Sequence, residues 1–360
     1  MTQALIFIAG LVGLVAGAEL LVRGASRLAL ALGISPLVVG LTIVALGTSA
    51  PEMTVSVSAV LDGQTGLALG NVVGSNIFNV LGILGLAALI TPLVVHVQVI
   101  RQEVPIMIGA ALLVIVLSLD GNIGLFDAAL LTALVVAYTV FLIVQSRAQG
   151  KDAGDYGDQV PPAPGKAWVQ VLMVLAGLAL LVAGSEAMVS SAVYFAQRMG
   201  VSDVVIGLTI VAVGTSLPEV AASVTAAFKG ERDVAVGNVV GSCVFNLLGV
   251  LGLGGLAAGL TAAGSLPVPP SVMNFDLWVM LAALGACLPI FLTGREVARW
   301  EGAVFLVYYG VYTAYLILEA QAHDVLPAFS GVMLGFVLPL TVVTLVVASL
   351  RGQAGGPGGR

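Results

Sequence analysis

Charged side chains are scarce in this sequence of 360 residues. Asp, Glu, Lys and Arg together make up 9% of the chain, whereas hydrophobic residues make up 59%, and the mean hydropathy is +1.12. A soluble domain is excluded, because so few charges cannot cover its surface. The formal net charge of −6 also leaves no basic surface for nucleic acid. This composition is typical of a polytopic membrane protein.

Cysteine and histidine are equally rare, with two residues of each. Cys243 and Cys287 both lie in apolar stretches, which argues against a disulfide framework and a cysteine-based zinc site. His96 and His323 lie in expected loops, so no histidine falls in an expected membrane span. A serine nucleophile inside the membrane would therefore have no base. We predict that the chain is not an enzyme and has no cofactor.

Long apolar runs are what the chain does contain. A helix needs about 20 residues, at about 1.5 Å per residue, to cross about 30 Å of hydrocarbon. We predict an all-α membrane protein with ten such helices, five on each side of a polar segment. The expected spans are 4–31, 35–61, 66–91, 103–119 and 124–146, followed by 167–198, 203–229, 233–261, 275–293 and 299–319.

Composition divides the chain into five parts. We predict a first repeat of five spans over residues 1–146 and a second over residues 167–319, joined by a cytoplasmic, Pro- and Gly-rich linker at 147–166. Residues 320–350 are expected to contain an eleventh membrane helix without a counterpart in the first repeat. Residues 351–360 form a Gly-rich tail that we expect to be disordered.

The positions of Lys and Arg predict the orientation in the membrane. If the N-terminus is outside, 12 of the 13 basic residues fall on the cytoplasmic side, together with the C-terminus, and only Arg198 falls outside. Because each repeat has an odd number of spans, the second enters the membrane from the opposite side. We therefore expect two inverted repeats, an architecture typical of secondary transporters with a mid-membrane site at the repeat interface.

The two halves contain a repeated sequence. Residues 34–86 align without a gap with residues 201–253, and 31 of the 53 aligned positions are identical. The alignment superimposes Gly47–Glu52 (GTSAPE) on Gly214–Glu219 (GTSLPE). Each hexapeptide lies in an apolar run, where a charged side chain costs about 2.5–3.5 kcal/mol at the bilayer centre. Carboxylates at two equivalent positions therefore favour a functional site.

Each hexapeptide is expected to break its helix. Pro51 has no N–H to donate to the carbonyl of Gly47, and Gly47 itself weakens the helix. Irregular backbone at membrane depth is tolerated where it lines a cavity, and its free carbonyls can then bind a cation. Thr48 and Ser49 add hydroxyl oxygens, and Glu52 follows Thr48 by one helical turn. The second hexapeptide repeats each of these features.

The next span of each repeat carries a second polar cluster. Ser75 and Asn79 are four residues apart and share a helix face, as do Ser242 and Asn246. Calcium binds about six to eight oxygens with carboxylates among them. The two glutamates, with the hydroxyl, amide and backbone oxygens of both clusters, can provide such a set.

These paired motifs, GTS-x-PE and GN-x-x-GS-x-x-x-N, resemble those of the cation/calcium exchanger superfamily, particularly its prokaryotic sodium/calcium exchangers. The resemblance covers residues 1–319. It implies an antiporter that exchanges Na⁺ for Ca²⁺ across a prokaryotic plasma (inner) membrane by alternating access, as the first and sixth spans slide, with ions and lipids as its partners. It also implies the metal-binding residues Glu52, Glu219, Thr48, Thr215, Ser49, Ser216, Ser75, Ser242, Asn79, Asn246, Ala45 and Ala212.

Asn246 departs from the family pattern, because members of the sodium/calcium branch often carry aspartate there. The amide leaves the coupling ion open, so a Ca²⁺/H⁺ antiporter is an alternative. A cation channel is an alternative from another class, since broken helices and carboxylates can also line a selectivity filter. Glu19 and Glu186 correspond between the repeats as well, and from them we expect a structural or gating contact instead of ion ligation.

Overall fold

The computed structural model describes residues 2–152, 167–200, 212–261, 264–321, 323, 325–333 and 335. Within these ranges, eight helices are long and apolar enough to cross a membrane. They are Thr2–Leu32, Thr65–Ile90, Val99–Leu117, Leu125–Ala148, Ala167–Arg198, Arg232–Gly259, Val272–Leu292 and Arg299–Ala320. One further span consists of Pro36–Thr48 and Ala50–Leu61, which meet at a bend of 40°. The predicted all-α polytopic fold is confirmed.

The described elements of the two predicted repeats follow one another in the same order. Those of the first are α1 (Thr2–Leu32), α2 (Pro36–Val39), the π-helical η1 (Gly40–Val44), α3 (Ala45–Thr48), α4 (Ala50–Leu61), α5 (Thr65–Ile77), the π-helical η2 (Phe78–Leu84), α6 (Gly85–Ile90), β1 (Leu93–Val94), the π-helical η3 (Val99–Glu103), α7 (Val104–Leu117), β2 (Asn122–Ile123) and α8 (Leu125–Asp152). Those of the second are α9 (Ala167–Arg198), α11 (Ala212–Gly214), α12 (Leu217–Phe228), α13 (Arg232–Val244), the π-helical η5 (Phe245–Val250), α14 (Leu251–Gly259), β3 (Leu266–Pro267), the π-helical η6 (Val272–Asp276), α15 (Leu277–Leu292), β4 (Glu296–Val297) and α16 (Arg299–Ala320).

Two short antiparallel ribbons connect the repeats. β1 pairs with β4, and β2 pairs with β3, so that each ribbon takes one strand from each repeat. Leu93 lies opposite Val297, and Ile123 lies opposite Leu266. Such reciprocal pairing is expected when a pseudo-two-fold axis relates two inverted repeats.

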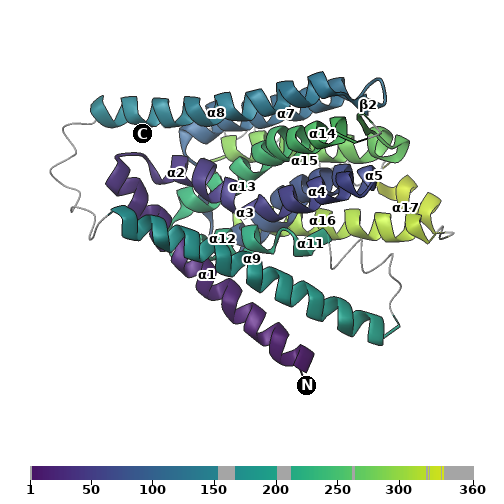
Figure 1. Ribbon diagram of the computed structural model, residues 1–360, viewed down its shortest axis with the longest axis horizontal. Coiled ribbons are helices and arrows are strands. Elements are labelled where there is room, and N and C mark those ends of the chain that lie inside the picture. The colour runs from purple at the N-terminus through teal and green to yellow at the C-terminus, as the bar shows by residue number, and fades with distance from the viewer. Residues whose placement is uncertain are drawn as a thin grey trace, which may run out of the picture.

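The long helices α1 and α9 lie side by side along one side of the bundle (Figure 1). Glycines form their interface. A Cβ on Gly177 would lie 2.6 Å from Leu21 N, and a Cβ on Gly184 would lie 2.7 Å from Gly10 O. No larger residue fits at these positions, so the two backbones approach as closely as in other membrane helix pairs built on small residues. The two helices therefore pack as one unit.

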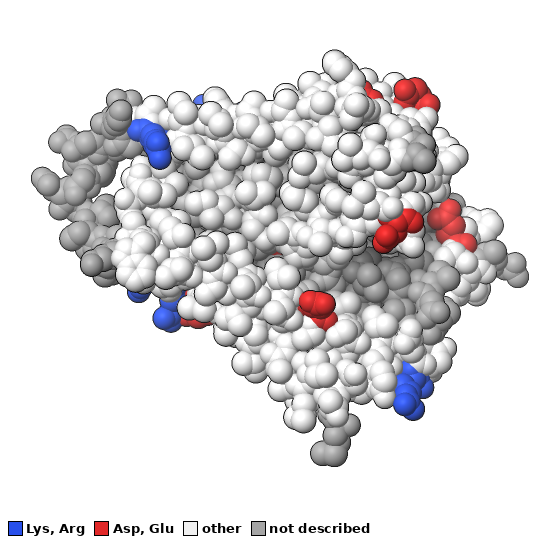
Figure 2. All heavy atoms as spheres, viewed as in Figure 1, with Lys and Arg blue, Asp and Glu red and all other residues white. Residues whose placement is uncertain are grey.

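The centre of the bundle is α13, on which every residue from Val234 to Val244 is buried. The outer helices instead expose large apolar side chains, among them Phe126 on α8 and Val307 on α16. The face of the molecule in Figure 2 accordingly shows few charged groups. An extended apolar surface of this kind marks a membrane interaction.

Several predicted segments extend beyond the described residues. α8 continues to Asp152, inside the predicted linker 147–166, whose remaining residues lie outside the described ranges. The short helix α17 (Leu326–Val332) lies at the start of the expected eleventh span, most of which is outside those ranges, as is the whole of the tail 351–360. The eleventh helix and the domain boundaries therefore stay predictions.

Candidate ion-binding site

Two broken helices carry the two acidic residues of the hexapeptides. The first span bends at Ser49, which has φ −79° and ψ 4°, and the second breaks at Ser216, which has φ −89° and ψ 8°. The predicted helix breaks are thus confirmed. Each proline lies at the start of the new helix, α4 or α12, where its missing N–H is not needed. Glu52 and Glu219 follow in the first turn, where the helix dipole favours a negative charge.

Each carboxylate is bound by a serine of the other repeat. Ser49 Oγ donates a hydrogen bond to Glu219 Oε1 over 3.1 Å, and Ser216 Oγ donates one to Glu52 Oε1 over 2.8 Å. Both glutamates are fully buried. The second oxygen of each, Oε2, has no hydrogen-bond partner among the described residues. Because a buried polar atom without a partner is costly, the two Oε2 atoms are suited to bind a cation.

The threonines of the hexapeptides contact asparagines of the opposite repeat. Thr48 Oγ1 donates to Asn238 Oδ1 over 3.1 Å, and Asn238 Nδ2 donates to Ser223 Oγ over 2.9 Å. The equivalent contacts lead from Thr215 Oγ1 to Asn71 Oδ1 over 3.3 Å and from Asn71 Nδ2 to Ser56 Oγ over 3.0 Å. The same arrangement thus occurs twice, related by the exchange of repeats.

Four of these residues are absent from the predicted site. They are Asn71, Asn238, Ser56 and Ser223. The two asparagines accept hydrogen bonds from the hexapeptide threonines and donate hydrogen bonds to the two serines. A signal for them exists in the sequence, because all four are identical between the repeats at the same offset as the two glutamates. Asn71 and Asn238 also open the GN-x-x-GS-x-x-x-N motif, whereas Ser56 and Ser223 lie outside both motifs.

The predicted asparagine ligands lie in π-helical segments, Asn79 in η2 and Asn246 in η5. Turns of this kind occur frequently at functional sites. Both side chains are buried, and neither their Oδ1 nor their Nδ2 atoms have a hydrogen-bond partner in the part of the chain that the structure describes. Ser242 Oγ is likewise buried without a partner there, whereas Ser75 Oγ lies 3.3 Å from Ser216 Oγ.

This set of atoms suits a hard cation. It combines two carboxylates with amide and hydroxyl oxygens, which are the ligands that calcium and sodium take. No cluster of three or more His, Cys, Asp or Glu side chains able to hold a metal occurs within the described ranges. Among the described residues, Glu52 and Glu219 supply the carboxylates of this set.

The predicted backbone ligands lie one turn before the helix breaks. The carbonyl of Ala45 accepts hydrogen bonds from Ser49 N over 3.0 Å and from Thr48 Oγ1 over 3.4 Å. Ala212 is the first residue of α11. The carbonyl of Gly214 accepts a hydrogen bond from Ser185 Oγ of α9 over 2.7 Å, so α9 contacts the second helix break directly.

Glu19 and Glu186 lie in different surroundings. Glu19 on α1 forms ion pairs with Arg23 NH2 at 2.5 Å and with Lys229 Nζ, at the end of α12, at 2.6 Å. Glu186 is exposed on α9. The expected structural contact is thus present at Glu19, where it joins the two repeats.

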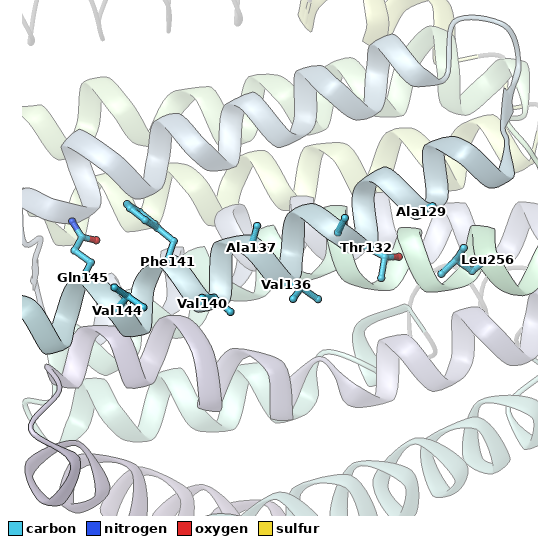
Figure 3. Close-up of a pocket in the computed structure, with 10 residues that line it drawn as sticks. Ala129, Thr132, Val136, Ala137, Val140, Phe141, Val144, Gln145 and Leu256 are labelled. Carbon is cyan, nitrogen blue, oxygen red and sulfur yellow. The ribbon is translucent and has the colours of Figure 1, made fainter.

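An apolar groove on the outside of the bundle is separate from this site. It has a volume of about 1110 Å³ and runs along the outer face of α8, where Thr132, Val136 and Phe141 line it, to Leu256 on α14 (Figure 3). Its lining is almost entirely apolar and offers no charged group to an ion. Such a groove on an outer helix fits lipid chains.

The family model described as "Sodium/calcium exchanger protein" matches residues 2–144 and 169–318. The CaxA protein of Alkalimonas amylolytica is 39% identical over 315 residues, which are 85% of this chain and 96% of that protein. The sodium/calcium exchanger MaX1 of Methanosarcina acetivorans is 33% identical over 350 residues, with 87% of this chain and 97% of that protein covered.

Among solved structures, the sodium-calcium exchanger NCX_Mj soaked with Na⁺ and Ca²⁺ superimposes with a TM-score of 0.74 at 28% identity. The superposition covers 87% of this chain and 98% of that one. A family match over most of the chain, and a shared fold over nearly the whole of NCX_Mj, lead to one conclusion. The chain belongs to the sodium/calcium exchanger family of membrane antiporters, and it is a secondary transporter, not an enzyme.

Proposed function

We propose that this protein exchanges Na⁺ for Ca²⁺ across the membrane by alternating access. The observation that carries the proposal is the pair of fully buried glutamates, Glu52 and Glu219, each with one carboxylate oxygen that has no hydrogen-bond partner among the described residues. Both residues begin a half-helix, one in each inverted repeat. A transported ion at the interface of inverted repeats is exposed to one side of the membrane or the other as one part of the protein moves against the rest.

Calcium is the ion that the two carboxylates favour most. Their combined charge of −2, when both are ionised, equals the charge of one Ca²⁺. The remaining oxygens would be neutral, and calcium accepts such mixed ligand sets of about six to eight oxygens. The proposed ligands are the side chains of Glu52, Glu219, Thr48, Thr215, Ser49, Ser216, Ser75, Ser242, Asn79 and Asn246 and the backbone carbonyls of Ala45 and Ala212.

Sodium is proposed as the coupling ion. Two observations support sodium. The relative MaX1 is a sodium/calcium exchanger, and the hydroxyl, amide and backbone oxygens of the proposed ligand set are neutral and suit a monovalent hard cation. Three Na⁺ ions at a site of charge −2 would leave a charge of +1, whereas one Ca²⁺ leaves none. An exchange of about three Na⁺ for one Ca²⁺ would therefore carry one charge per cycle and respond to membrane potential, with about 2.3 kcal/mol per charge per 100 mV.

The moving part in this proposal is the pair of helices α1 and α9. Their close glycine interface supports movement as one unit.

We place the N-terminus outside and the C-terminus on the cytoplasmic side of a prokaryotic plasma membrane. Asp62 and Lys229, which are equivalent positions in the two repeats, then face opposite sides. An impermeant thiol reagent should label Asp62→Cys from outside intact cells and leave Lys229→Cys unlabelled, and the reverse pattern would invert the topology.

Ion flux into sealed proteoliposomes tests the proposed function. A Na⁺ gradient imposed without a pH gradient should drive Ca²⁺ uptake with an electrical current, at a fixed ratio of the two ions. Uptake driven by a pH gradient alone would replace sodium by protons as the coupling ion. Ca²⁺ entry without any coupling to Na⁺ or H⁺, at rates far above those of a carrier, would identify a channel.

A further inference from the structure

Two acid–tyrosine pairs lie outside the candidate ion-binding site, at equivalent places in the two repeats. Tyr138 of α8 donates its hydroxyl to Glu103 Oε2 over 2.8 Å, and Tyr312 of α16 donates its hydroxyl to Asp276 Oδ1 over 2.8 Å. Glu103 is the last residue of η3, and Asp276 is the last residue of η6. Asp276 follows Glu103 by 173 positions, and Tyr312 follows Tyr138 by 174. The alignment of residues 34–86 with residues 201–253 does not reach these pairs.

The first pair belongs to a buried polar network. Glu103 is fully buried, and its Oε1 accepts hydrogen bonds from Gln98 Nε2 over 3.0 Å and from Gln102 Nε2 over 2.8 Å. Gln102 and Gln145 of α8 exchange two further hydrogen bonds, of 2.9 and 2.8 Å. A buried network in which the polar groups are satisfied makes the elements that it joins rigid. The network therefore holds α8 in a defined position relative to η3 and α7.

The position of α8 matters because α8 packs on the other repeat. A Cβ on Gly252 of α14 would lie 2.9 Å from Thr132 N and 3.2 Å from Ala128 O, so the backbones of the two helices approach closely at this glycine. One turn further along α8, Val135 lies within contact distance of the position of a Cβ on Gly249 in η5. Tyr138 comes one turn later again and lines a groove of about 370 Å³ together with Leu248 of η5. The tyrosine is thus beside the segment that carries Asn246.

The second pair has the same relation to the first repeat. A Cβ on Gly302 of α16 would lie 2.6 Å from the carbonyl oxygen of Gly85 in α6. Two turns along α16, the ring of Tyr309 lies 4.8 Å from the ring of Phe78, measured between centroids, and Phe78 immediately precedes Asn79 in η2. Tyr312 follows Tyr309 by one turn. Each acid–tyrosine pair therefore anchors the helix that supports the π-helical segment of the opposite repeat.

We propose that Glu103–Tyr138 positions Asn246, and that Asp276–Tyr312 positions Asn79, as ligands for the transported ion. The proposal rests on the proposed function, since it takes both asparagines as ligands. Neither asparagine side chain has a hydrogen-bond partner among the described residues, so the backbone of η5 or η2 determines where each amide points. That backbone is supported by α8 or α16. The tyrosines act through the asparagines and do not themselves touch the ion.

A double-mutant cycle on ion binding tests the proposal. Ca²⁺ binding to the purified, full-length protein in detergent is measured by calorimetry for Tyr138→Phe, for Asn246→Ala and for both together. We expect Tyr138→Phe to weaken binding about three- to tenfold, within the range of about two- to thirtyfold over which residues in a coupled network act on a site. In a protein that already carries Asn246→Ala, Tyr138→Phe should not weaken Ca²⁺ binding further. In a protein that carries Asn79→Ala, Tyr138→Phe should weaken Ca²⁺ binding by its full factor. Tyr312→Phe should show the opposite preference.

Several controls separate positioning from folding and from transport. Tyr315→Phe keeps the ring that stacks on Phe275 at 4.3 Å and should leave binding unchanged. The thermal midpoint of each variant shows whether it is folded, and a loss of stability alone would not depend on which asparagine is present. Equal coupling of Tyr138 to both asparagines, or unchanged binding in a folded Tyr138→Phe protein, would overturn the proposal.

The same assay distinguishes this proposal from the proposed function. A wild-type protein that binds Ca²⁺ but shows no Na⁺-driven uptake would refute the exchange and leave the binding cycle to decide the roles of the tyrosines. A wild-type protein that binds no Ca²⁺ would overturn both.

Discussion

The two repeats are nearly identical around Glu52 and Glu219 and differ at the ends of α4 and α12. At the centre, Ser49 binds Glu219 and Ser216 binds Glu52, with distances of 3.1 and 2.8 Å. At the ends of α4 and α12 the symmetry is lost, because Lys229 pairs with Glu19, whereas the equivalent positions hold Asp62 and Glu186. Two acidic residues cannot form an ion pair with each other.

The arrangement of the helices shows the same contrast. α1 packs along α12, whereas the described residues of α9 make no comparable contact with α4. The pair of α1 and α9 is therefore attached more closely to the second repeat than to the first. The hydrogen bonds around the two glutamates are thus symmetric, whereas the packing of α1 and α9 on the two repeats is not.

The largest effect is expected from changes at the symmetric centre. Glu52→Gln and Glu219→Gln each leave a single negative charge for a divalent ion. Each should lower Ca²⁺ transport at least about 100-fold, since loss of a mere outer-shell partner of a metal ligand already costs about 10- to 100-fold. Because the two carboxylates have equivalent surroundings, the two variants should be equally impaired. Glu186→Gln is the matched control and should transport normally.

The measurement is Ca²⁺ uptake into proteoliposomes that contain equal amounts of each folded variant. Wild-type uptake by Glu52→Gln would contradict the assignment of the site. Strong impairment of only one glutamate variant would contradict the equivalence of the two halves.

The interface of α1 and α9 should give the next largest effect. Gly177→Ala places a Cβ 2.6 Å from Leu21 N, so the helices must separate, and overpacking of this kind costs about 1–3 kcal/mol. Gly13→Ala is the control, because its Cβ would lie 3.5 Å from the nearest atom, an ordinary contact. Thermal unfolding in detergent should show a lower midpoint for Gly177→Ala alone. Equal midpoints would show that the two helices are not tightly packed.

A third change sharpens the comparison at the π-helical segments. Asn246→Asp adds a carboxylate to the second repeat only, and the added charge should strengthen Na⁺ binding and make transport more dependent on pH. Asn79→Asp adds the same charge to the first repeat and serves as the matched variant. Na⁺ competition against Ca²⁺ binding, measured at several pH values, compares the two. Unchanged Na⁺ affinity in Asn246→Asp would exclude residue 246 from the ion site.

The smallest effect is expected at the asymmetric ion pair. Glu19 and Lys229 are partly exposed, with side-chain exposures of 35% and 25%, and such pairs contribute about 0.2–1 kcal/mol. Lys229→Gln should therefore alter the exchange rate by no more than about fivefold. Asp62→Lys places at the equivalent position of the first repeat the residue type that the second repeat has there. It would allow an ion pair with Glu186, which has none among the described residues, only if α9 came to pack along α4, and it should then change the rate in the opposite direction. If both variants change the exchange rate in the same direction and to the same extent, the difference between Lys229 and Asp62 has no role in exchange.

The fold was largely predictable because its signals are local. Apolar runs of about 20 residues define the spans, and the hexapeptides define both helix breaks, at Ser49 and Ser216. The internal repeat then indicated the site, because charged residues at two equivalent positions within apolar sequence favour a function. The spans near residues 103 and 275 nevertheless begin earlier, at Val99 and Val272, because π-helical segments precede α7 and α15.

The partners within the site were harder to predict. Thr48 and Asn238 are 190 residues apart, and no local pattern relates them. The acid–tyrosine pairs were missed for a different reason, because the spacing between the repeats changes from 167 to 173 and 174 beyond the aligned region. Contacts across an interface of two repeats depend on how the repeats are placed in space, which the order of residues along one repeat does not contain.

A structure of the protein determined with Ca²⁺ tests the proposed site most directly. We predict a single strong density peak between the two broken helices, in contact with Glu52 Oε2 and Glu219 Oε2, and its loss in a Glu52→Gln protein treated in the same way. A Ca²⁺ ion bound elsewhere, with both glutamate oxygens still out of contact with it, would contradict the account.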